Sequence, residues 1–342
     1  MKGYHYVGLD VHKKKIYYCV KTADGDVVDE GKINATRKEL FLFADRLPKP
    51  WVGGMEATLF TGWIYDELKP HAHEIHVGHS YMLKAICAAK KKNDRLDAAK
   101  IADAVRCDLM PTCHMAPPEI RELRRMLRYR GFLVRQSVRM KNKTAGLLME
   151  VGAEYSKKKL HGRRYFNKLL EELADTPDSV KQMAAQTHAC MELFESNQKR
   201  IVAALKKHPK LRERIERLMT IPGVGEITAL TWALEVDDPH RFSNSGKAVS
   251  YCGLCSGQSE SAGKPHRGPL SKQRNKHLQS ILVEAAKLAA QWNPRLEMVK
   301  EKSLARGANK NEATIDVARK LVAYLLAVDK SGKAFSMKER DL

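Results

Sequence analysis

The sequence predicts an α/β domain at the N-terminus, a helical connector and a mainly α-helical domain at the C-terminus. Short apolar runs separated by turns and helices form the beginning of the chain. From Pro117 onward, apolar residues recur at three- and four-residue intervals, which is the period of an α-helix. The chain has 342 residues, enough for two domains and a connector, and we place the boundaries at 1–150, 151–212 and 213–342.

The N-terminal elements are predicted in the order βββαβαβα. Three apolar runs, the first of which ends at Asp10, form a meander in which Ala23-Asp24-Gly25-Asp26 supplies a hairpin turn. A helix with the capping box Thr36-Arg37-Lys38-Glu39 follows, and then a strand that ends at Glu56. This order, with carboxylates at two strand tips, is the plan of an RNase H-like domain. Such α/β sheets bind their ligands beyond the strand ends, so we expect the chemistry there.

Two more carboxylates lie in the stretch Lys92-Asn93-Asp94-Arg95-Leu96-Asp97-Ala98-Ala99-Lys100, which is typical of a helix start capped by Asn93 or Asp94. Asp94 and Asp97 share one helix face and repel each other, which a fold tolerates best when a cation lies between them. We expect them to join the two strand-tip carboxylates around Mg²⁺, which prefers oxygen ligands. The predicted ligands are Asp10, Glu56, Asp94 and Asp97. The alternative is a helix cap beside a solvated charge.

A large basic surplus indicates a polyanionic partner. Lys and Arg number 61 and Asp and Glu 40, so the formal net charge is +21. Nucleic acid is the favoured partner, because contacts to phosphates release condensed counterions. A membrane is disfavoured, because no signal-peptide core follows Met1 and the late apolar run from Leu321 to Val328 is too short to span a bilayer. The 7 scattered cysteines favour reduced thiols and a cytoplasmic protein.

The helical segment after Pro117 contains many arginines and few acids to pair with them. A solvated charged face is the alternative, but this excess favours a phosphate-binding surface. The arginines predicted to bind nucleic acid are Arg121, Arg124, Arg125, Arg128 and Arg135. Residues from about Asp178 to Leu205 predict one long amphipathic helix, suited to a helical arm or a coiled coil.

A short glycine-containing turn, Ile221-Pro222-Gly223-Val224-Gly225, lies between two predicted helices. This is a helix-hairpin-helix pattern. Gly223 and Gly225 would let the backbone approach a phosphate, which the first N–H groups of the next helix could bind. A Schellman-capped turn without a ligand is the alternative.

The stretch from Cys255 to Lys264 is predicted to be a short polar loop of small residues. A serine that faces several cations could attack phosphorus, because the cations stabilise the developing negative charge. It could equally be an ordinary loop, and the residues alone do not choose among Ser256, Ser259 and Ser261. The basic residues predicted to contact nucleic acid nearby are Lys264, His266, Arg267, Lys272 and Arg274.

Several motifs along nearly the whole chain match those of a known protein family. They are Gly8-Leu9-Asp10-Val11-His12, Gly54-Met55-Glu56-Ala57-Thr58, Asn93-Asp94-Arg95-Leu96-Asp97-Ala98, the 221–225 turn and Ala318-Arg319-Lys320-Leu321. Together they resemble the insertion-sequence 110 family of bacterial transposases, also called DEDD recombinases. The Piv-type DNA invertases share this layout.

The resemblance implies an N-terminal RuvC-like domain, a coiled-coil region and a C-terminal transposase domain. It implies that the four acids are the DEDD carboxylates and that Ser261 is the catalytic serine, with Ser259 as the second choice. Family members act as dimers that pair into tetramers, guided by a structured bridge RNA that specifies target and donor DNA. The expected function is therefore recombination of insertion-sequence DNA by Mg²⁺-assisted serine attack, in the bacterial cytoplasm at the nucleoid.

Other functions remain open at this point. A RuvC-like nuclease would use the acids to activate water, with Ser261 as a structural residue, and a Piv-type invertase would recombine DNA at other sites. A nucleic-acid binder without catalysis is disfavoured, because four carboxylates have no purpose in binding anionic phosphate. The acids and the serine lie far apart in the sequence, so serine recombination requires a composite site formed by domain closure or by a partner subunit.

Overall fold

The computed structural model describes residues 3–87, 93–261 and 263–336. The chain divides into two compact units, of which the first ends at Pro118 and the second begins at Glu119. The long basic helix, α5 (Pro118–Glu150), therefore belongs with the second unit, whereas the predicted boundary at residue 150 assigned it to the first. The reason is packing, because Leu123 and Leu127 of α5 join the hydrophobic core of the second unit.

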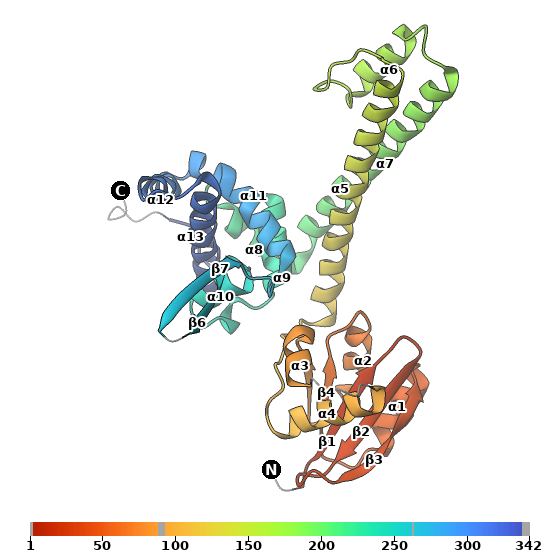
Figure 1. Ribbon diagram of the computed structural model, residues 1–342, viewed down its shortest axis with the longest axis vertical. Helices are drawn as coiled ribbons and strands as arrows, with labels where there is room; N and C mark the ends of the chain where they lie inside the picture. The colour runs from red at the N-terminus through yellow and green to blue at the C-terminus, as the bar shows by residue number, and fades with distance from the viewer. Residues whose placement is uncertain (1–2, 88–92, 262, 337–342) are drawn as a thin grey trace. The chain divides into compact units, whose positions relative to one another are not determined.

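The first unit contains a five-stranded sheet of order β3-β2-β1-β4-β5 (Figure 1). The strands are β1 (His5–Val11), β2 (Lys15–Lys21), β3 (Val27–Asn34), β4 (Trp51–Glu56) and β5 (Glu74–Gly78). The first three strands form the antiparallel meander that the sequence predicts, and β4 and β5 continue the sheet in parallel with β1. Its helices are α1 (Arg37–Arg46), α2 (Thr61–Leu68), α3 (Ser80–Ile86) and α4 (Asp94–Arg106). This mixed sheet confirms the predicted α/β domain and is consistent with an RNase H-like fold.

Helix α4 lies directly on the backbone of β1. A Cβ atom added at Gly8 would overlap the backbone of Ala98 and Ala102, and one added at Gly54 would overlap the side chain of Val105. The two glycines therefore let the helix axis approach the sheet more closely than side chains would allow. This close approach brings the start of α4 to the strand that carries Asp10.

The second unit is mainly helical, as predicted. Its helices are α5, α6 (Arg163–Glu172), α7 (Asp178–Lys207), α8 (Pro209–Met219), α9 (Glu226–Val236), η1 (Pro239–Arg241), α10 (Ser245–Tyr251), α11 (Lys276–Trp292), α12 (Pro294–Ala305) and α13 (Lys310–Ser331). Its strands are β6 (Ser256–Ser261) and β7 (Lys264–Leu270). Helix α7 is the long amphipathic helix expected between Asp178 and Leu205.

Helices α5 and α7 run antiparallel as a helical arm, with α6 near its end (Figure 1). The hydroxyls of Thr144 and Thr187 lie 2.8 Å apart, and Nζ of Lys141 lies 2.7 Å from a carboxylate oxygen of Glu195. Leu147, Leu148, Leu160, Phe166, Leu169 and Ala184 form a separate hydrophobic cluster. The arm is thus a pair of helices within one chain.

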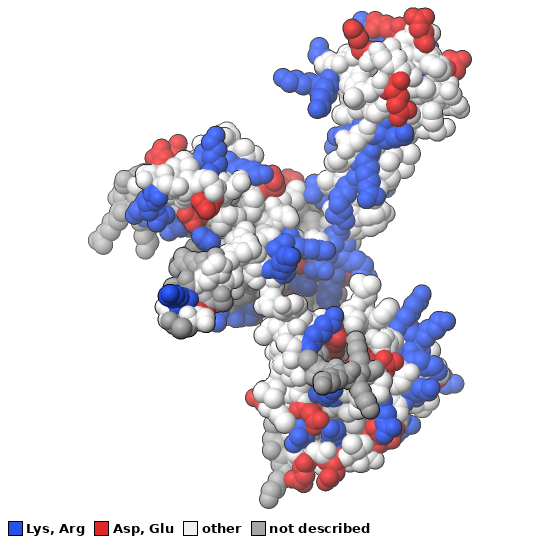
Figure 2. Space-filling view, viewed as in Figure 1, with Lys and Arg blue, Asp and Glu red and all other residues white. Residues whose placement is uncertain are grey.

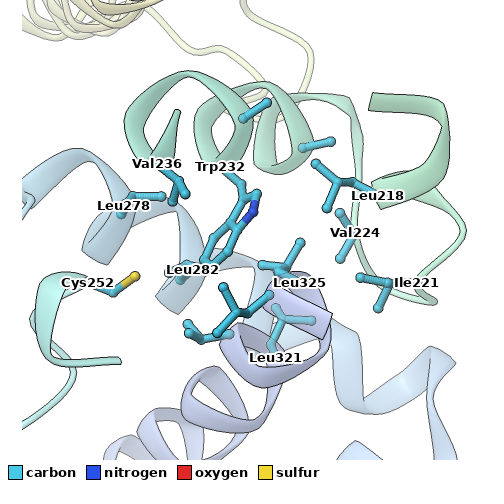
Figure 3. Close-up of a cluster of buried hydrophobic side chains, with 14 of the residues drawn as sticks. Leu218, Ile221, Val224, Trp232, Val236, Cys252, Leu278, Leu282, Leu321 and Leu325 are labelled. Carbon is cyan, nitrogen blue, oxygen red and sulfur yellow. The ribbon is translucent and has the colours of Figure 1, made fainter. Parts of the chain in front are cut away.

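The core of the second unit surrounds the buried Trp232 of α9 (Figure 3). Figure 3 labels, besides this tryptophan, Leu218, Ile221, Val224, Val236, Cys252, Leu278, Leu282, Leu321 and Leu325. The indole Nε1 donates a hydrogen bond to Asp329 at 2.8 Å. Two residues of the predicted helix-hairpin-helix turn, Ile221 and Val224, are therefore buried in this hydrophobic core.

A buried carboxylate joins α5, α9 and the start of α11. Glu235 is 1% exposed, and Arg128 donates two hydrogen bonds to it, each at 2.7 Å. The side-chain amide of Asn275 donates a third at 2.8 Å, and Nε of Arg124 donates to the neighbouring carbonyl of Leu234 at 2.8 Å. Burial acts to raise the pKa of Glu235, but the hydrogen bonds from Arg128 and Asn275, together with the charges of Arg128 and Arg124, outweigh it and hold that pKa below its ordinary value.

We expect the second unit to lose stability in acid because of this carboxylate. A carboxyl group whose pKa is lowered by folding contributes stability above its unfolded pKa, near 4.5, and loses it as the pH falls through the folded value. Glu235→Gln should lower the free energy of unfolding at neutral pH by about 1–3 kcal/mol. The free energy of unfolding should also decrease less in this variant than in the wild type as the pH falls. Thermal unfolding measured from neutral pH downward checks both. Glu284→Gln, an exposed change on α11, is the matched control, and an unchanged pH dependence in Glu235→Gln would contradict the assignment.

Candidate active site

The four predicted carboxylates line one pocket of about 750 Å³ in the first unit. Asp10 lies near the end of β1 and Glu56 at the end of β4, and because these strands are parallel neighbours, their carboxyl ends share one edge of the sheet. Asp94 and Asp97 lie in the first turn of α4. The fold therefore brings together four acids that are widely separated in the sequence.

The start of α4 is fixed by a side-chain cap. The side-chain oxygen of Asn93 accepts a hydrogen bond from the N–H of Leu96 at 2.8 Å, so the cap is Asn93 and not Asp94. Carboxylates in the first turn also interact favourably with the positive end of the helix dipole. Because Asn93 caps the helix, Asp94 is not needed as the cap, and its side chain lines the pocket. Lys92, the first residue of the predicted motif, lies outside the described residues.

The charge on Asp10 is disfavoured in the pocket. Its side chain is 16% exposed, and burial raises its pKa above the ordinary value. His12 acts in the opposite direction, and the charges of Asp94 and Asp97 raise the pKa further. A divalent cation among these oxygens would remove the repulsion, so the donor set fits a metal ion.

His12 is a residue of this site that the sequence analysis missed as a functional group. Its Nε2 lies 3.0 Å from Oδ2 of Asp10 and 3.5 Å from Oδ1 of Asp94. Ligand atoms of these three residues all lie within 4.8 Å of one another. Side chains two apart along a strand point to the same face, which is the signal that could have found the histidine. The prediction of Mg²⁺ assumed that all ligands are oxygen atoms, but the nitrogen of His12 is also available as a donor.

Basic side chains also border the pocket. Lys13, Lys84 and Lys100 line it, and Nζ of Lys100 lies 3.7 Å from a carboxylate oxygen of Asp97. None of these lysines was predicted as a site residue. Their charge offsets part of the acidic cluster and can attract a phosphate.

The serine-containing stretch is a β-hairpin, and the prediction of a loop was wrong. Strands β6 and β7 pair antiparallel, with Ser261 opposite Lys264 beside the turn. The stretch is polar and largely exposed, so it lacks the apolar alternation that would have indicated a strand. Ser261, Lys264 and His266 are exposed. Ala262 and the side chains of Ser259 and Arg267 lie outside the described parts of the chain.

Two of the predicted phosphate-binding arginines have another role. Arg124 and Arg128 are engaged with the Leu234 carbonyl and with Glu235, so they do not belong to a surface without acidic partners. Arg125 and Arg135 are exposed, and Arg121 is half-buried. Figure 2 shows Lys and Arg side chains gathered along the helical arm.

The two glycines of the 221–225 turn differ in their surroundings. Gly223 has a φ of +90°, and a Cβ there would lie 2.6 Å from Cα of Ala289, so packing against α11 explains this glycine. Gly225 is the N-cap of α9, and a Cβ there would meet open space. Lys272 and Arg274, in the segment before α11, are both exposed. Phosphate contacts by these four residues remain predictions.

The sheet order and the carboxylates gathered at its edge are consistent with a DEDD-type enzyme. A family model for IS110-type DEDD transposases, described as "Transposase", matches residues 7–153. A second, described as "Transposase IS116/IS110/IS902 family", matches residues 215–300. The chain belongs to this family of transposases. It is therefore an enzyme that cuts and rejoins DNA, and a domain of this type depends on a divalent metal.

Curated relatives agree with this assignment. The chain is 24% identical to the transposase for insertion sequence element IS1328 of Yersinia enterocolitica, over 96% of this chain and 98% of the relative. It is 28% identical to the transposase for IS1111A of Coxiella burnetii, over 57% of this chain and 54% of the relative. A probable family 20 transposase of Pseudomonas aeruginosa is 25% identical over 82% of each chain. In the described residues, no helix combines the length and the apolar character needed to cross a membrane.

Proposed function

We propose that this transposase cuts and rejoins the DNA of its insertion sequence by attack of Ser261 on a phosphodiester, assisted by Mg²⁺. The observation that carries the metal part is the single pocket lined by Asp10, Glu56, Asp94 and Asp97, which would hold the ion. A bound ion supplies charge neutralisation at the scissile phosphate and lowers the pKa of an attacking hydroxyl. Mg²⁺ suits the four carboxylates, whereas the nitrogen of His12 would also suit Mn²⁺.

In the proposed step, Oγ of Ser261 attacks phosphorus, and a proton equivalent to the one it loses is taken up by the departing 3′ oxygen. A phosphoserine bond forms, the bond from phosphorus to the 3′ oxygen breaks, and the strand leaves with a 3′ hydroxyl. The phosphodiester energy is retained in the covalent intermediate, so strands can be rejoined without ATP. Exposure of Ser261 and its pairing with Lys264 support this role, since a cation beside the serine favours the anionic transition state. His266 and Arg267 are proposed to contact phosphate from the same hairpin.

The partners are proposed on the resemblance and on charge. A net charge of +21 and the exposed arginines of α5 suit binding of DNA together with a bridge RNA. We also propose dimers that pair into tetramers, acting at the nucleoid in the cytoplasm. A Piv-type invertase would use the same residues on differently arranged DNA sites. Its product would be an inverted DNA segment, which distinguishes it from a transposase.

A metal-dependent nuclease is the second candidate, and one observation favours it. The four carboxylates and His12 all belong to the first unit, so activation of a water molecule needs no residue of the second. In that reaction water replaces the serine as nucleophile, and Ser261 is dispensable.

The test is a cleavage assay with purified protein, its co-purified RNA, a DNA junction and Mg²⁺, resolved on a denaturing gel. We expect a DNA–protein adduct that persists in SDS and is absent in Ser261→Ala. Ser259→Ala is the matched control, because it removes another serine hydroxyl of the same strand, β6, and should leave the adduct. Free nicked ends that Ser261→Ala still produces would establish the nuclease instead. If the adduct is lost in Ser259→Ala and kept in Ser261→Ala, the nucleophile is Ser259.

A further inference from the structure

We propose that the exposed face of α5 stacks unpaired nucleobases on Tyr129 and Phe132. Tyr129 is 55% exposed and Phe132 41%, although both are large aromatic residues. Their ring centroids lie 5.7 Å apart with an angle of 21° between the planes, so the two rings form a nearly parallel stack at the surface. The inference extends the phosphate-binding surface proposed for α5 and assigns base contacts to it.

Basic residues continue this aromatic pair along the helix. Arg125 precedes Tyr129 by four residues, and Arg135 follows Phe132 by three, which keeps all four on one face. Arg139 lies a further turn along and is also exposed. Within the described residues, these three arginines take part in no salt bridge.

The aromatic pair is not needed for the helix to pack. The two leucines of α5 that join the core of the second unit, Leu123 and Leu127, lie on the side of the helix opposite Phe132. The buried Leu133 follows Tyr129 by four residues and lies beside it. Neither ring belongs to a hydrophobic cluster of the described residues, so the pair forms an exposed aromatic patch that is free to contact a ligand.

The chemistry of this face matches a single strand. An aromatic ring offers a stacking platform for any base, and flanking arginines contact the phosphates on either side. Arg125 and Arg135 are about 15 Å apart along the helix axis, so the strand can follow the helix. Bases in a duplex are already stacked and present only their edges in the grooves, so the rings would not reach their faces.

A second copy of this chain fits the face less well. No acidic residue lies between Arg125 and Arg139 in the sequence. A two-fold contact through this face would place the same arginines opposite each other, and like charges across an interface oppose association. The charge therefore favours a polyanion as the occupant.

The experiment measures binding of the full chain to fluorescent single-stranded RNA, single-stranded DNA and duplex DNA of one sequence, by anisotropy. Phe132→Leu retains an apolar side chain and removes the ring, and it should weaken binding to single strands about tenfold while changing duplex binding by less than about twofold. Phe132→Tyr keeps an aromatic ring at this position, so it should bind single strands as tightly as the wild type. Val138→Ala, an exposed change on the same helix, is the matched control. Thermal unfolding verifies that every variant is folded.

Single-strand binding by Phe132→Leu at the wild-type level would overturn the inference. An equal loss for single strands and duplex would also overturn it, because phosphate contacts alone would then explain the face. Loss of a dimer in sedimentation experiments would show that a second copy covers the rings. A difference between RNA and DNA identifies the natural strand. Because this readout is equilibrium binding and the Ser261 readout is a covalent adduct, either can fail without the other.

Discussion

Asp10→Asn is expected to abolish metal-dependent cleavage of DNA, with a loss on the order of 1,000-fold. Asp10 is the least exposed of the three aspartates in the pocket, with 16% of its side chain exposed against 44% for Asp94 and 21% for Asp97. It also contacts His12 at 3.0 Å. Asparagine keeps the shape but removes the charge proposed to bind a metal ion, so the reaction should fail although the pocket survives.

The fold of this variant should be intact, which separates catalysis from stability. Burial raises the pKa of Asp10, and the neighbouring acids raise it further, so without metal the ionised aspartate is disfavoured. Asp10→Asn should therefore unfold at no lower temperature than the wild type in chelator, and it should still bind DNA. Asp45→Asn, at an exposed position on α1, is the matched control and should cleave normally. Cleavage by Asp10→Asn at the wild-type rate would refute the placement of the active site.

Gly8→Val is expected to give the second large effect, a loss of both stability and cleavage. Even the first carbon of a side chain at Gly8 would overlap the backbone of Ala98 and Ala102. Backbone cannot rotate away as a flexible side chain can, so α4 must move off the sheet. We expect a decrease of about 1–3 kcal/mol or more in the free energy of unfolding. Cleavage should fall because Asp94 and Asp97 move with the helix.

Chemical unfolding and hydrogen exchange check this prediction. The amides of α4 should exchange faster in Gly8→Val than in the wild type, while those of the second unit should not change. Gly146→Ala is the matched control, because a Cβ at Gly146 meets no atom within 4 Å. Gly146 lies inside α5, four residues before its end, so that change should raise stability by up to about 1 kcal/mol. Wild-type stability in Gly8→Val would show that the helix does not lie against the strand.

The N-terminal sheet could be predicted because its signals are local. Apolar alternation and the Asp24-Gly25 turn define the meander. Glu56 ends β4, and Asp10 lies one residue before the end of β1. Parallel neighbouring strands place their tips at the same edge, so the meeting of these two acids needs no knowledge of side-chain contacts. The position of these two acids relative to Asp94 and Asp97 depends on the packing of α4 against Gly8 and Gly54. The spacing of residues in the sequence does not show this packing.

Other features depend on partners that are distant in the sequence or on exposed backbone. Arg128 lies 107 positions before Glu235, so its ion pair could not be read from the charges near it. The hairpin of β6 and β7 is held by backbone pairing and has little apolar pattern to reveal it. Helix α12 has weak apolar periodicity, so the sequence does not indicate its range clearly, although Asn293 caps it and Pro294 occupies its first position.

The contact at Gly8 also determines which part of the active site can adjust. Main-chain atoms fix the separation between β1 and α4, and no rotamer change or small cavity can alter it. If the pocket holds a metal ion as proposed, ions of different radius would be accommodated by rotation of the Asp10, Glu56, Asp94 and Asp97 carboxylates and of the His12 ring, while the helix stays in place. The sheet and helix would thus hold the backbone of the proposed ligands at a fixed separation, and adjustment to the size of the ion would come from side-chain torsions.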